Sequence, residues 1–424
     1  MVNLQYTNLS YKPTNKDLVC EYFLQPNKIS FERACEHVAA ESSIGTWTDI
    51  KTMNKSIAKR LKPHIFDMNL KRGAVRIAYP SELFEAGNMP QILSSIAGNI
   101  FGMKAVKNLR LQDISFPKPI IKKFKGPKFG IKGIRKLLKI KKRPLVGTIV
   151  KPKVGLTAEQ HAKVAYEAWV GGLDIVKDDE NLSNMDFNKF EKRVQLTLKM
   201  RDLAEKKTGE RKMYMPNTTA ETKEMIRRAK IIKIEGGEYA MIDIITAGWA
   251  GLQSLREADL GLVIHAHRAG HGAFTENPKH GISMLTVAKC ARLIGVDQIH
   301  IGAIVGKMKG EKEEVEIIGE EIEKQIIHPN KSAHLLEQKW FNIKPVFAVC
   351  SGGLHPGKIP PLMKAMGNNI IMQFGGGCHG HPDGTMHGAK AVRQALEATL
   401  KGISLEDYAE NHIALHKALL KWSK

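Results

Sequence analysis

The residues best suited to chemistry gather in one short stretch, GGLDIVKDDENL, at residues 171–182. A single lysine, Lys177, lies there among four carboxylates, at the end of an apolar run that reads as a buried strand. An ordinary ion-paired lysine is the simplest explanation of the stretch taken alone. Asp179 and Glu180 are also hard oxygen donors of the kind that suits Mg²⁺, although two carboxylates leave an octahedral ion short of ligands.

A change of charge on Lys177 would supply the missing ligand. If its amine loses a proton and adds CO₂, the lysine becomes a carbamate anion with an oxygen ligand beside Asp179 and Glu180. Burial and the like charges of Lys151 and Lys153 both disfavour the ammonium form and so favour this reaction. The stretch is therefore consistent with a metal site as well as with a salt bridge.

Other polar residues fall at the ends of apolar runs in the same way. Taken singly, each has an ordinary explanation: a histidine bonded to backbone, a lysine that faces water, or a glycine that forms a turn. Together they suggest one polar rim. They are Lys151, Lys153, His267, Arg268, His300, Lys307, the SGG of residues 351–353 and the QFGGG of residues 373–377.

The elements that must position these residues follow Pro144, where short β-branched runs alternate with longer amphipathic patterns. Eight such runs lie within about 280 residues, which predicts a (β/α)₈ TIM barrel over residues 126–424. An open doubly wound sheet is the alternative, but it rarely needs eight repeats in unbroken succession. In a barrel, chemistry belongs to the C-terminal strand ends, where the polar residues fall. Two Gly-rich turns and several cations there favour a multiply anionic sugar phosphate as ligand.

The N-terminal part, residues 1–125, mixes helical and strand patterns without βα regularity and predicts a separate α+β domain. Residues 118–143 contain many lysines and no acidic residue, and we expect a solvated basic linker there. The net charge of +22 raises nucleic acid as a partner, but no nucleic-acid-binding motif accompanies it. A basic binding protein on a barrel scaffold would leave the polar rim unexplained.

Composition favours an ordinary globular protein. The chain has 424 residues, of which 43% are hydrophobic, enough for a large core. We find no secretory leader and no apolar run long enough to cross a bilayer, so we expect a cytoplasmic protein with no membrane partner. The five cysteines form no CxxC pair, and we expect them to be reduced and mostly buried.

Several motifs, in this order and at these separations, resemble one family. GTIVKPKVGL, GGLDIVKDDEN, HAHRAGH, IHIGAIVGK, SGG and QFGGG are similar to the large chain of ribulose-1,5-bisphosphate carboxylase/oxygenase (rubisco). The resemblance extends to the N-terminal ESSIGTWT and GNIFG, so it covers most of the chain. The compact length and GGGCHGHPDGTMHG are most similar to the archaeal-type form III branch.

The resemblance implies a fold and a role for each residue. It implies a ferredoxin-like N-terminal domain, and Lys177 as the carbamylated lysine that binds one Mg²⁺ with Asp179 and Glu180. Lys151 and His267 would transfer protons, and Lys307 would meet the incoming CO₂. The expected substrate-binding residues are Lys153, Arg268, His300, Ser351, Gly352, Gly353, Gln373, Phe374, Gly375 and Gly376. From the N-terminal domain, Glu41, Thr46, Trp47 and Asn99 would complete the active site of a partner subunit.

The implied reaction removes a proton from carbon 3 of ribulose 1,5-bisphosphate and adds CO₂, or O₂ as a competitor, at carbon 2. Addition of CO₂, hydration by one water molecule and cleavage then give two molecules of 3-phosphoglycerate. The archaeal branch implies a role in AMP or nucleoside salvage, and a homodimer or ring of dimers without a small subunit. The alternative is a rubisco-like enolase or isomerase that acts on another sugar phosphate.

Overall fold

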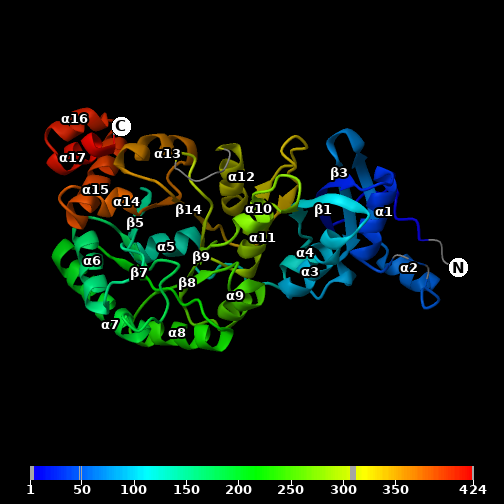
Figure 1. Ribbon diagram of the computed structural model, residues 1–424, viewed down its shortest axis with the longest axis horizontal. Coiled ribbons are helices and arrows are strands. Elements are labelled where there is room, and N and C mark those ends of the chain that lie inside the picture. The colour runs from blue at the N-terminus through cyan, green and yellow to red at the C-terminus, as the bar shows by residue number, and fades with distance from the viewer. Residues whose placement is uncertain (1–3, 47, 49, 306–311, 423–424) are drawn as a thin grey trace. The chain divides into compact units, whose positions relative to one another are not determined.

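The computed structural model describes residues 4–46, 48, 50–305 and 312–422, and the chain folds into two compact units (Figure 1). The first unit comprises residues 1–126, 270–294 and 324–343. The second comprises residues 127–269, 295–323 and 344–424. The chain therefore returns to the first unit twice after leaving it.

The first unit is built on a five-stranded sheet with the order β10-β4-β1-β3-β2. Its strands are β1 (Asp17–Pro26), β2 (His64–Asn69), β3 (Ala74–Pro80), β4 (Val106–Ser115) and β10 (Gly281–Ile282). Helix α1 (Phe31–Glu41) lies between β1 and β2 in sequence, and α3 (Met89–Ile96) lies between β3 and β4. The hydroxyl of Ser30 and the side chain of Asn88 cap these helices. This βαββαβ arrangement confirms the ferredoxin-like domain.

Short elements complete the first unit. The first of the two later segments contributes the cation of a buried ion pair, in which Lys289 Nζ of α11 lies 2.8 Å from Asp113 Oδ1 of β4. The short elements are α2 (Lys55–Leu61), η1 (Leu70–Arg72), η2 (Ser81–Leu83), η3 (Asn99–Gly102), α4 (Lys118–Ile121), α10 (Gly272–Thr275), α11 (Met284–Ile294), β12 (Ile326–Ile327) and β13 (Gln338–Lys339).

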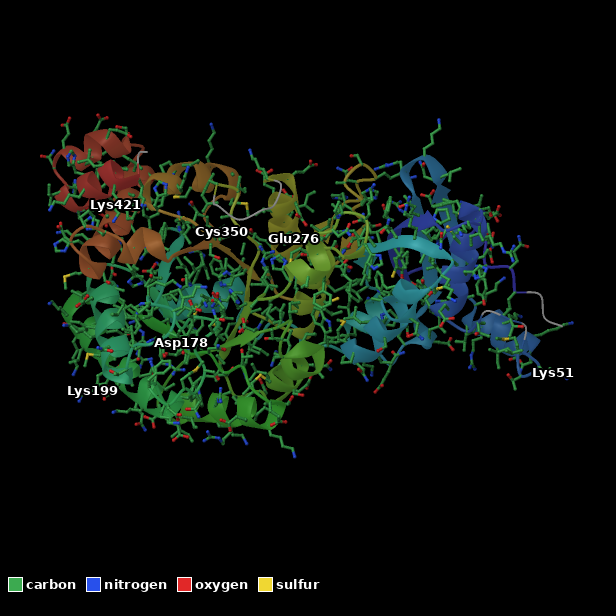
Figure 2. The ribbon with its side chains drawn as sticks, viewed as in Figure 1. Lys51, Asp178, Lys199, Glu276, Cys350 and Lys421 are labelled. Atoms are coloured by element: carbon green, nitrogen blue, oxygen red, sulfur yellow. The ribbon has the colours of Figure 1, made fainter. Side chains whose placement is uncertain are left out.

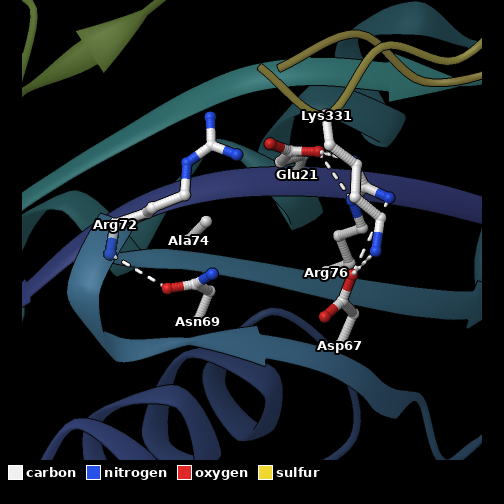
Figure 3. A pocket seen from close by; sticks show the side chains of 7 residues that line it. All are labelled: Glu21, Asp67, Asn69, Arg72, Ala74, Arg76 and Lys331. Carbon is white, nitrogen blue, oxygen red and sulfur yellow. Dashed lines mark hydrogen bonds and ion pairs between the residues drawn. The ribbon is translucent and has the colours of Figure 1, made fainter. Parts of the chain in front are cut away.

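A group of charged side chains fastens the segment after β12 to the sheet (Figure 3). Arg76 on β3 lies 2.6 Å from Glu21 and 3.8 Å from Asp67. From the segment after β12, Lys331 reaches Asp67 at 3.4 Å and His334 reaches Glu21 at 2.5 Å. Each carboxylate in the group faces at least one arginine, lysine or histidine side chain, so we interpret the group as structural.

The second unit is a barrel of eight parallel strands with the order β7-β6-β5-β15-β14-β11-β9-β8. A parallel bridge between Asn217 and Met241 links the two ends of that order, next to β7 and on β8. Each of the eight predicted runs contains one strand, which confirms the TIM barrel. The strands are β5 (Leu145–Ile149), β6 (Ile175–Lys177), β7 (Met213–Met215), β8 (Tyr239–Asp243), β9 (Val263–His267), β11 (Gln298–His300), β14 (Phe347–Ser351) and β15 (Ile370–Phe374).

Amphipathic helices follow the strands, and α6, α7 and α8 lie along the outside of the strands of this unit in Figure 1. The Thr157 hydroxyl and the Gln160 side chain form a capping box that starts α6. The helices of this unit are α5 (Gly130–Leu138), α6 (Ala158–Val170), α7 (Phe190–Thr208), α8 (Thr222–Ile234), α9 (Gly248–Glu257), α12 (Lys312–Glu323), η4 (Pro356–Lys358), α13 (Ile359–Met366), α14 (Gly376–His379), α15 (Thr385–Lys401), α16 (Leu405–Glu410) and α17 (Ile413–Trp422).

The basic segment of residues 118–143 is not the solvated linker expected from its charge. Its helix α5 buries Ile131, Ile134 and Leu138 in a cluster with residues at the beginnings of the barrel strands, such as Leu145 and Val263. The lysines of α5 lie on its other face, where Lys132 and Lys136 are exposed. The expectation was wrong because apolar spacing of three and four residues, not net charge, decides whether a helix packs.

One expectation from composition, buried cysteines without disulfides, agrees with the structure. All five cysteines are free and buried. Within the part of the chain that the structure describes, no helix is long and apolar enough to span a membrane.

Candidate active site

The four carboxylates around Lys177 have different partners. Asp174 binds Arg143 at 2.7 Å and accepts the backbone N–H of Val146 at the beginning of β5. Asp178, labelled among the strands in Figure 2, accepts hydrogen bonds from Arg193 at 3.1 Å and from the Tyr214 hydroxyl at 2.6 Å. The cation of Arg193 holds the pKa of Asp178 well below its usual range despite complete burial. These two carboxylates are structural.

Lys177 ends β6 and is completely buried. Its Nζ atom donates to the backbone oxygen of Asp178 at 2.7 Å and lies 3.6 Å from a carboxylate oxygen of Glu180 and 3.3 Å from the sulfur of Met241. Burial lowers the pKa of this amine, and nearby carboxylates, Glu180 first, oppose the shift only in part. The site therefore favours the neutral amine more than water does.

Asp179 and Glu180 face the same region as Lys177. Asp179 lies 2.6 Å from the Nζ atom of Lys151, which follows β5. Burial alone would raise the pKa of Glu180, but the ammonium of Lys177 and then His267 lower it to about 2. The Glu180 carboxylate is therefore held as an anion, and Asp179 lies beside the side chain of Lys151.

Strands β8 and β9 supply a hydrogen-bonded pair. His267 Nδ1 lies 2.7 Å from Asp243 Oδ1, and its Nε2 lies 3.6 Å from a carboxylate oxygen of Glu180. A carboxylate on one ring nitrogen fixes the tautomer and leaves the other nitrogen free to move a proton. The next residue, Arg268, has its pKa lowered to about 10 by burial, so it remains a cation at neutral pH.

A second histidine chain reaches β14. His265 Nε2 lies 3.0 Å from His300 Nε2, and His300 Nδ1 lies 2.8 Å from the Ser351 hydroxyl. The rings of His265 and His300 meet edge to face, at an interplanar angle of 85°. Both histidines are buried, and burial lowers their pKa values well below the ordinary value. Both rings are therefore neutral at pH 7.

Two loops of glycines follow β14 and β15. Gly352 and Gly353 have φ angles of 106° and 76°, which side chains with a Cβ rarely adopt. A Cβ on Gly377 would lie 2.0 Å from the Leu354 carbonyl oxygen, so the two loops approach too closely for any other residue. Backbone N–H groups without covering side chains suit the binding of phosphate oxygens.

The structure thus brings many of the predicted residues to the carboxyl ends of the barrel strands. Lys153 also follows β5 but is exposed. Glu41, Thr46 and Asn99 belong to the first unit, at the end of α1, shortly after it, and at the beginning of η3. Trp47 and Lys307 lie outside the described residues. The residues at the strand ends and in the loops that follow are Lys151, Lys177, Asp179, Glu180, His267, Arg268, His300, Ser351, Gly352, Gly353, Gln373, Phe374, Gly375 and Gly376.

Two buried residues of this region were not predicted, Asp243 and His265. A signal for each was present in the sequence. Asp243 ends its apolar run as Lys177 does, and His265 lies two residues before His267 and so on the same face of the strand.

The donor set fits a hard cation only in part. Asp179 and Glu180 supply two carboxylates, and among the described residues no group of three His, Cys, Asp or Glu side chains could hold a metal. The buried amine of Lys177, 3.6 Å from Glu180, would supply a third oxygen ligand if it reacted with CO₂. The residues present therefore fit Mg²⁺ if Lys177 carries a carbamate.

The comparison with known families decides the identity of this architecture. Residues 5–120 match the family of the ribulose bisphosphate carboxylase large chain, N-terminal domain, and residues 130–422 match its catalytic domain. The chain belongs to the ribulose bisphosphate carboxylase large-chain family. The resemblance drawn from the sequence motifs is thereby confirmed.

Relatives match the whole length of the chain. The ribulose bisphosphate carboxylase of Methanosarcina barkeri is 56% identical over 423 residues, with 99% of each chain covered. That of Methanocaldococcus jannaschii is 52% identical over 426 residues, which cover 99% of this chain and 100% of the relative.

Solved structures of archaeal rubiscos have the same fold. The dimeric archaeal rubisco of Hyperthermus butylicus has a TM-score of 0.94 at 47% identity, with 99% of both chains covered. An octameric rubisco of Pyrococcus horikoshii has a TM-score of 0.91 at 45% identity, with 100% of this chain and 99% of the other covered. These similarities are consistent with the archaeal-type form III branch.

Proposed function

We propose that the rim of this barrel carboxylates ribulose 1,5-bisphosphate, with oxygenation as a side reaction. The observation that carries the proposal is the environment of Lys177, a completely buried amine that lies 3.6 Å from Glu180 and two residues before Asp179, the carboxylate bound by Lys151. Lys177 is not needed as the structural partner of Asp178, because that carboxylate is already paired with the cation of Arg193.

Lys177 becomes an anion when activator CO₂ binds covalently. The neutral amine attacks the carbon of CO₂, a C–N bond forms, and the nitrogen releases one proton to solvent. The lowered pKa of Lys177 assists this step, because only the unprotonated amine is a nucleophile. Lys177 as carbamate, Asp179 and Glu180 would then hold one Mg²⁺. When bound, that ion polarises substrate oxygens and stabilises developing negative charge.

The chain's own side chains orient the substrate and move its protons. Lys151 lies next to Asp179 and can deliver or accept a proton at the reacting carbons. His267, oriented by Asp243, has its Nε2 atom turned toward Glu180 and can act as a second proton carrier. Lys307 is proposed to meet CO₂ after the proton at carbon 3 has been removed.

The phosphate groups of the substrate would bind at the glycine loops after β14 and β15. Phosphate is an acceptor of hydrogen bonds, and the cationic Arg268, the hydroxyl of Ser351 and bare backbone N–H groups are donors of the matching kind. The proposed ligands are Lys153, Arg268, His300, Ser351, Gly352, Gly353, Gln373, Phe374, Gly375 and Gly376.

Assembly and pathway are further parts of the proposal. The relatives include a dimer and an octamer, and we propose a homodimer or ring of dimers for this chain. Glu41, Thr46, Trp47 and Asn99 would complete the site of the partner subunit. A role in AMP or nucleoside salvage is proposed in place of a carbon-fixation cycle.

The test uses purified protein, preincubated with CO₂ and Mg²⁺ and then given ribulose 1,5-bisphosphate and labelled bicarbonate. Acid-stable label should appear in 3-phosphoglycerate. Proton exchange at carbon 3 without any label in product would instead identify a rubisco-like enolase and contradict carboxylation.

A further inference from the structure

A row of polar side chains, most of them buried, runs along three neighbouring barrel strands, β9, β11 and β14. Gln298 on β11 is the register partner of His265 on β9. His265 Nε2 meets His300 Nε2 at 3.0 Å, and His300 Nδ1 meets the hydroxyl of Ser351 at 2.8 Å. His265 is completely buried and has no role in the chemistry proposed above.

The contact between the two imidazoles requires unlike protonation of its nitrogens. Both rings are neutral, so each carries one N–H and one bare nitrogen. At a separation of 3.0 Å, one Nε2 atom must donate and the other must accept. The choice between these two arrangements fixes whether His300 Nδ1 faces the Ser351 hydroxyl with a proton or as a bare nitrogen.

The ligand chemistry selects one arrangement. A phosphate oxygen only accepts, so Ser351 must direct its single O–H outward to contribute to phosphate binding. The Ser351 oxygen must then accept from His300 Nδ1–H, which leaves His300 Nε2 bare. His265 Nε2–H is the donor that a bare His300 Nε2 needs.

The far side of His265 is compatible with this arrangement. Its Nδ1 atom is buried and has no hydrogen-bond partner of good geometry among the described residues. A bare nitrogen in that position costs less than an unpaired N–H, since orphaned buried donors are the rarer case. Gln298 can also present its amide N–H there, because the two ends of a side-chain amide are interchangeable.

We propose that His265 is a positioning residue that holds His300 in the Nδ1-protonated form, so that Ser351 can donate its hydroxyl proton to a phosphate group of the substrate. This inference rests on the proposed function, because the direction of the chain follows from an anionic ligand. It adds His265 to the residues that determine substrate affinity, although His265 would not touch the substrate.

Two substitutions at one position test the role of the N–H. His265→Gln places an amide N–H close to the position of Nε2, whereas His265→Leu fills the space without a donor. His265→Leu should raise KM for ribulose 1,5-bisphosphate roughly tenfold, the effect of one hydrogen bond to a charged group, with a smaller change in kcat. His265→Gln should restore most of the affinity. Equal KM values for both variants would overturn the proposal.

A double-mutant cycle separates positioning from general damage. In a Ser351→Ala background the outward O–H is already gone, so adding His265→Leu should raise KM little further. The same fold increase in KM in both backgrounds would show that His265 does not act through Ser351, and would contradict the proposal.

A spectroscopic measurement distinguishes failure of this inference from failure of the carboxylase assignment. The ¹⁵N spectrum of histidine-labelled protein, with the His300 signals assigned by loss in His300→Gln, should show protonated Nδ1 and bare Nε2. This result requires no turnover. In His265→Leu the bare Nε2 signal should shift toward the protonated position. A wild-type His300 protonated on Nε2 would overturn the proposal even if carboxylation is observed.

Discussion

The two ends of the barrel strands bury side chains of opposite character. At the N-terminal end, Ile134 of α5 packs with Leu145, Val263 and other apolar residues. Even the buried cation of that end, Lys212, has a close partner, because its Nζ lies 2.8 Å from Glu210. At the C-terminal end, Lys177 is equally buried, but its nearest carboxylate oxygen lies 3.6 Å away.

This difference separates stability from chemistry within one set of strands. A well-paired buried charge contributes little beyond its own desolvation, and breaking the pair is costly. An imperfectly paired charge is a group whose protonation state can be changed at low cost, which catalysis requires. We therefore expect substitutions at the two ends to fall into opposite classes.

The largest contrast should come from two buried lysines. Lys177→Met should lower carboxylation by at least ~10²–10³-fold, the range for losing a group that stabilises transition-state charge. Its free energy of unfolding should stay equal or rise, since a desolvated ammonium is removed. Lys212→Met is the matched control and should lose roughly 1–3 kcal/mol of stability while keeping activity. Urea unfolding measures the stability of the two variants, and the labelled-bicarbonate assay measures their activity. A Lys177→Met protein that is less stable than Lys212→Met would break the comparison.

Adjacent carboxylates give the next contrast. Asp178→Asn weakens a buried pair with Arg193 and should cost about 3–5 kcal/mol of unfolding free energy. Asp179→Asn should cost less than half as much and abolish carboxylation. Thermal unfolding and activity of the two variants, prepared side by side, decide the matter. Similar losses of stability would mean that both carboxylates are structural.

The apolar end predicts the reverse phenotype. Ile134→Ala removes a completely buried side chain from α5 and should cost about 2–5 kcal/mol of unfolding free energy. At 25 °C, in protein that remains folded, kcat should match the wild type because no rim residue moves. A large fall in kcat with unchanged stability would contradict the division between the two ends.

The smallest effect concerns acid. The pKa of Glu180 is lowered from 4.5 to about 2, and although burial opposes this, the ammonium of Lys177 is the main cause that lowers it. Glu180 therefore contributes stability above about pH 4.5 that is lost as the pH falls toward 2. Without CO₂ and Mg²⁺, Lys177→Met should lose less stability than wild type over this window. Identical slopes of unfolding free energy against pH would show that the two groups do not interact.

Much of the barrel could be predicted from the sequence because its strands are short and locally encoded. A helical pattern separates each of the eight apolar runs from the next. The spacing of the apolar residues in a segment indicates whether that segment forms a strand or a helix. The different environments of Asp178 and Asp179 could also be predicted in part from the sequence. Lys177 and Asp179 have the same parity in an extended chain, whereas Asp178 faces the opposite side, where Arg193 lies.

Contacts between neighbouring strands could not be obtained in the same way. The pairing of His265 with His300 depends on β9 and β11 being adjacent, and that of Asp243 with His267 depends on β8 and β9. Helix α5 was misjudged because its charge concealed the spacing of Ile131 and Ile134. Sequence period identifies an element, but only the sheet order identifies the partners of its side chains.

The central claim is that Lys177 is the residue that activator CO₂ converts to an anion. Incubation of the protein with ¹³CO₂ and Mg²⁺, followed by ¹³C NMR, tests it directly. The account predicts one carbamate signal in wild type, retained in Lys212→Met and absent from Lys177→Met. A carbamate signal that persists in Lys177→Met, or a fully active wild type that shows none, would contradict it.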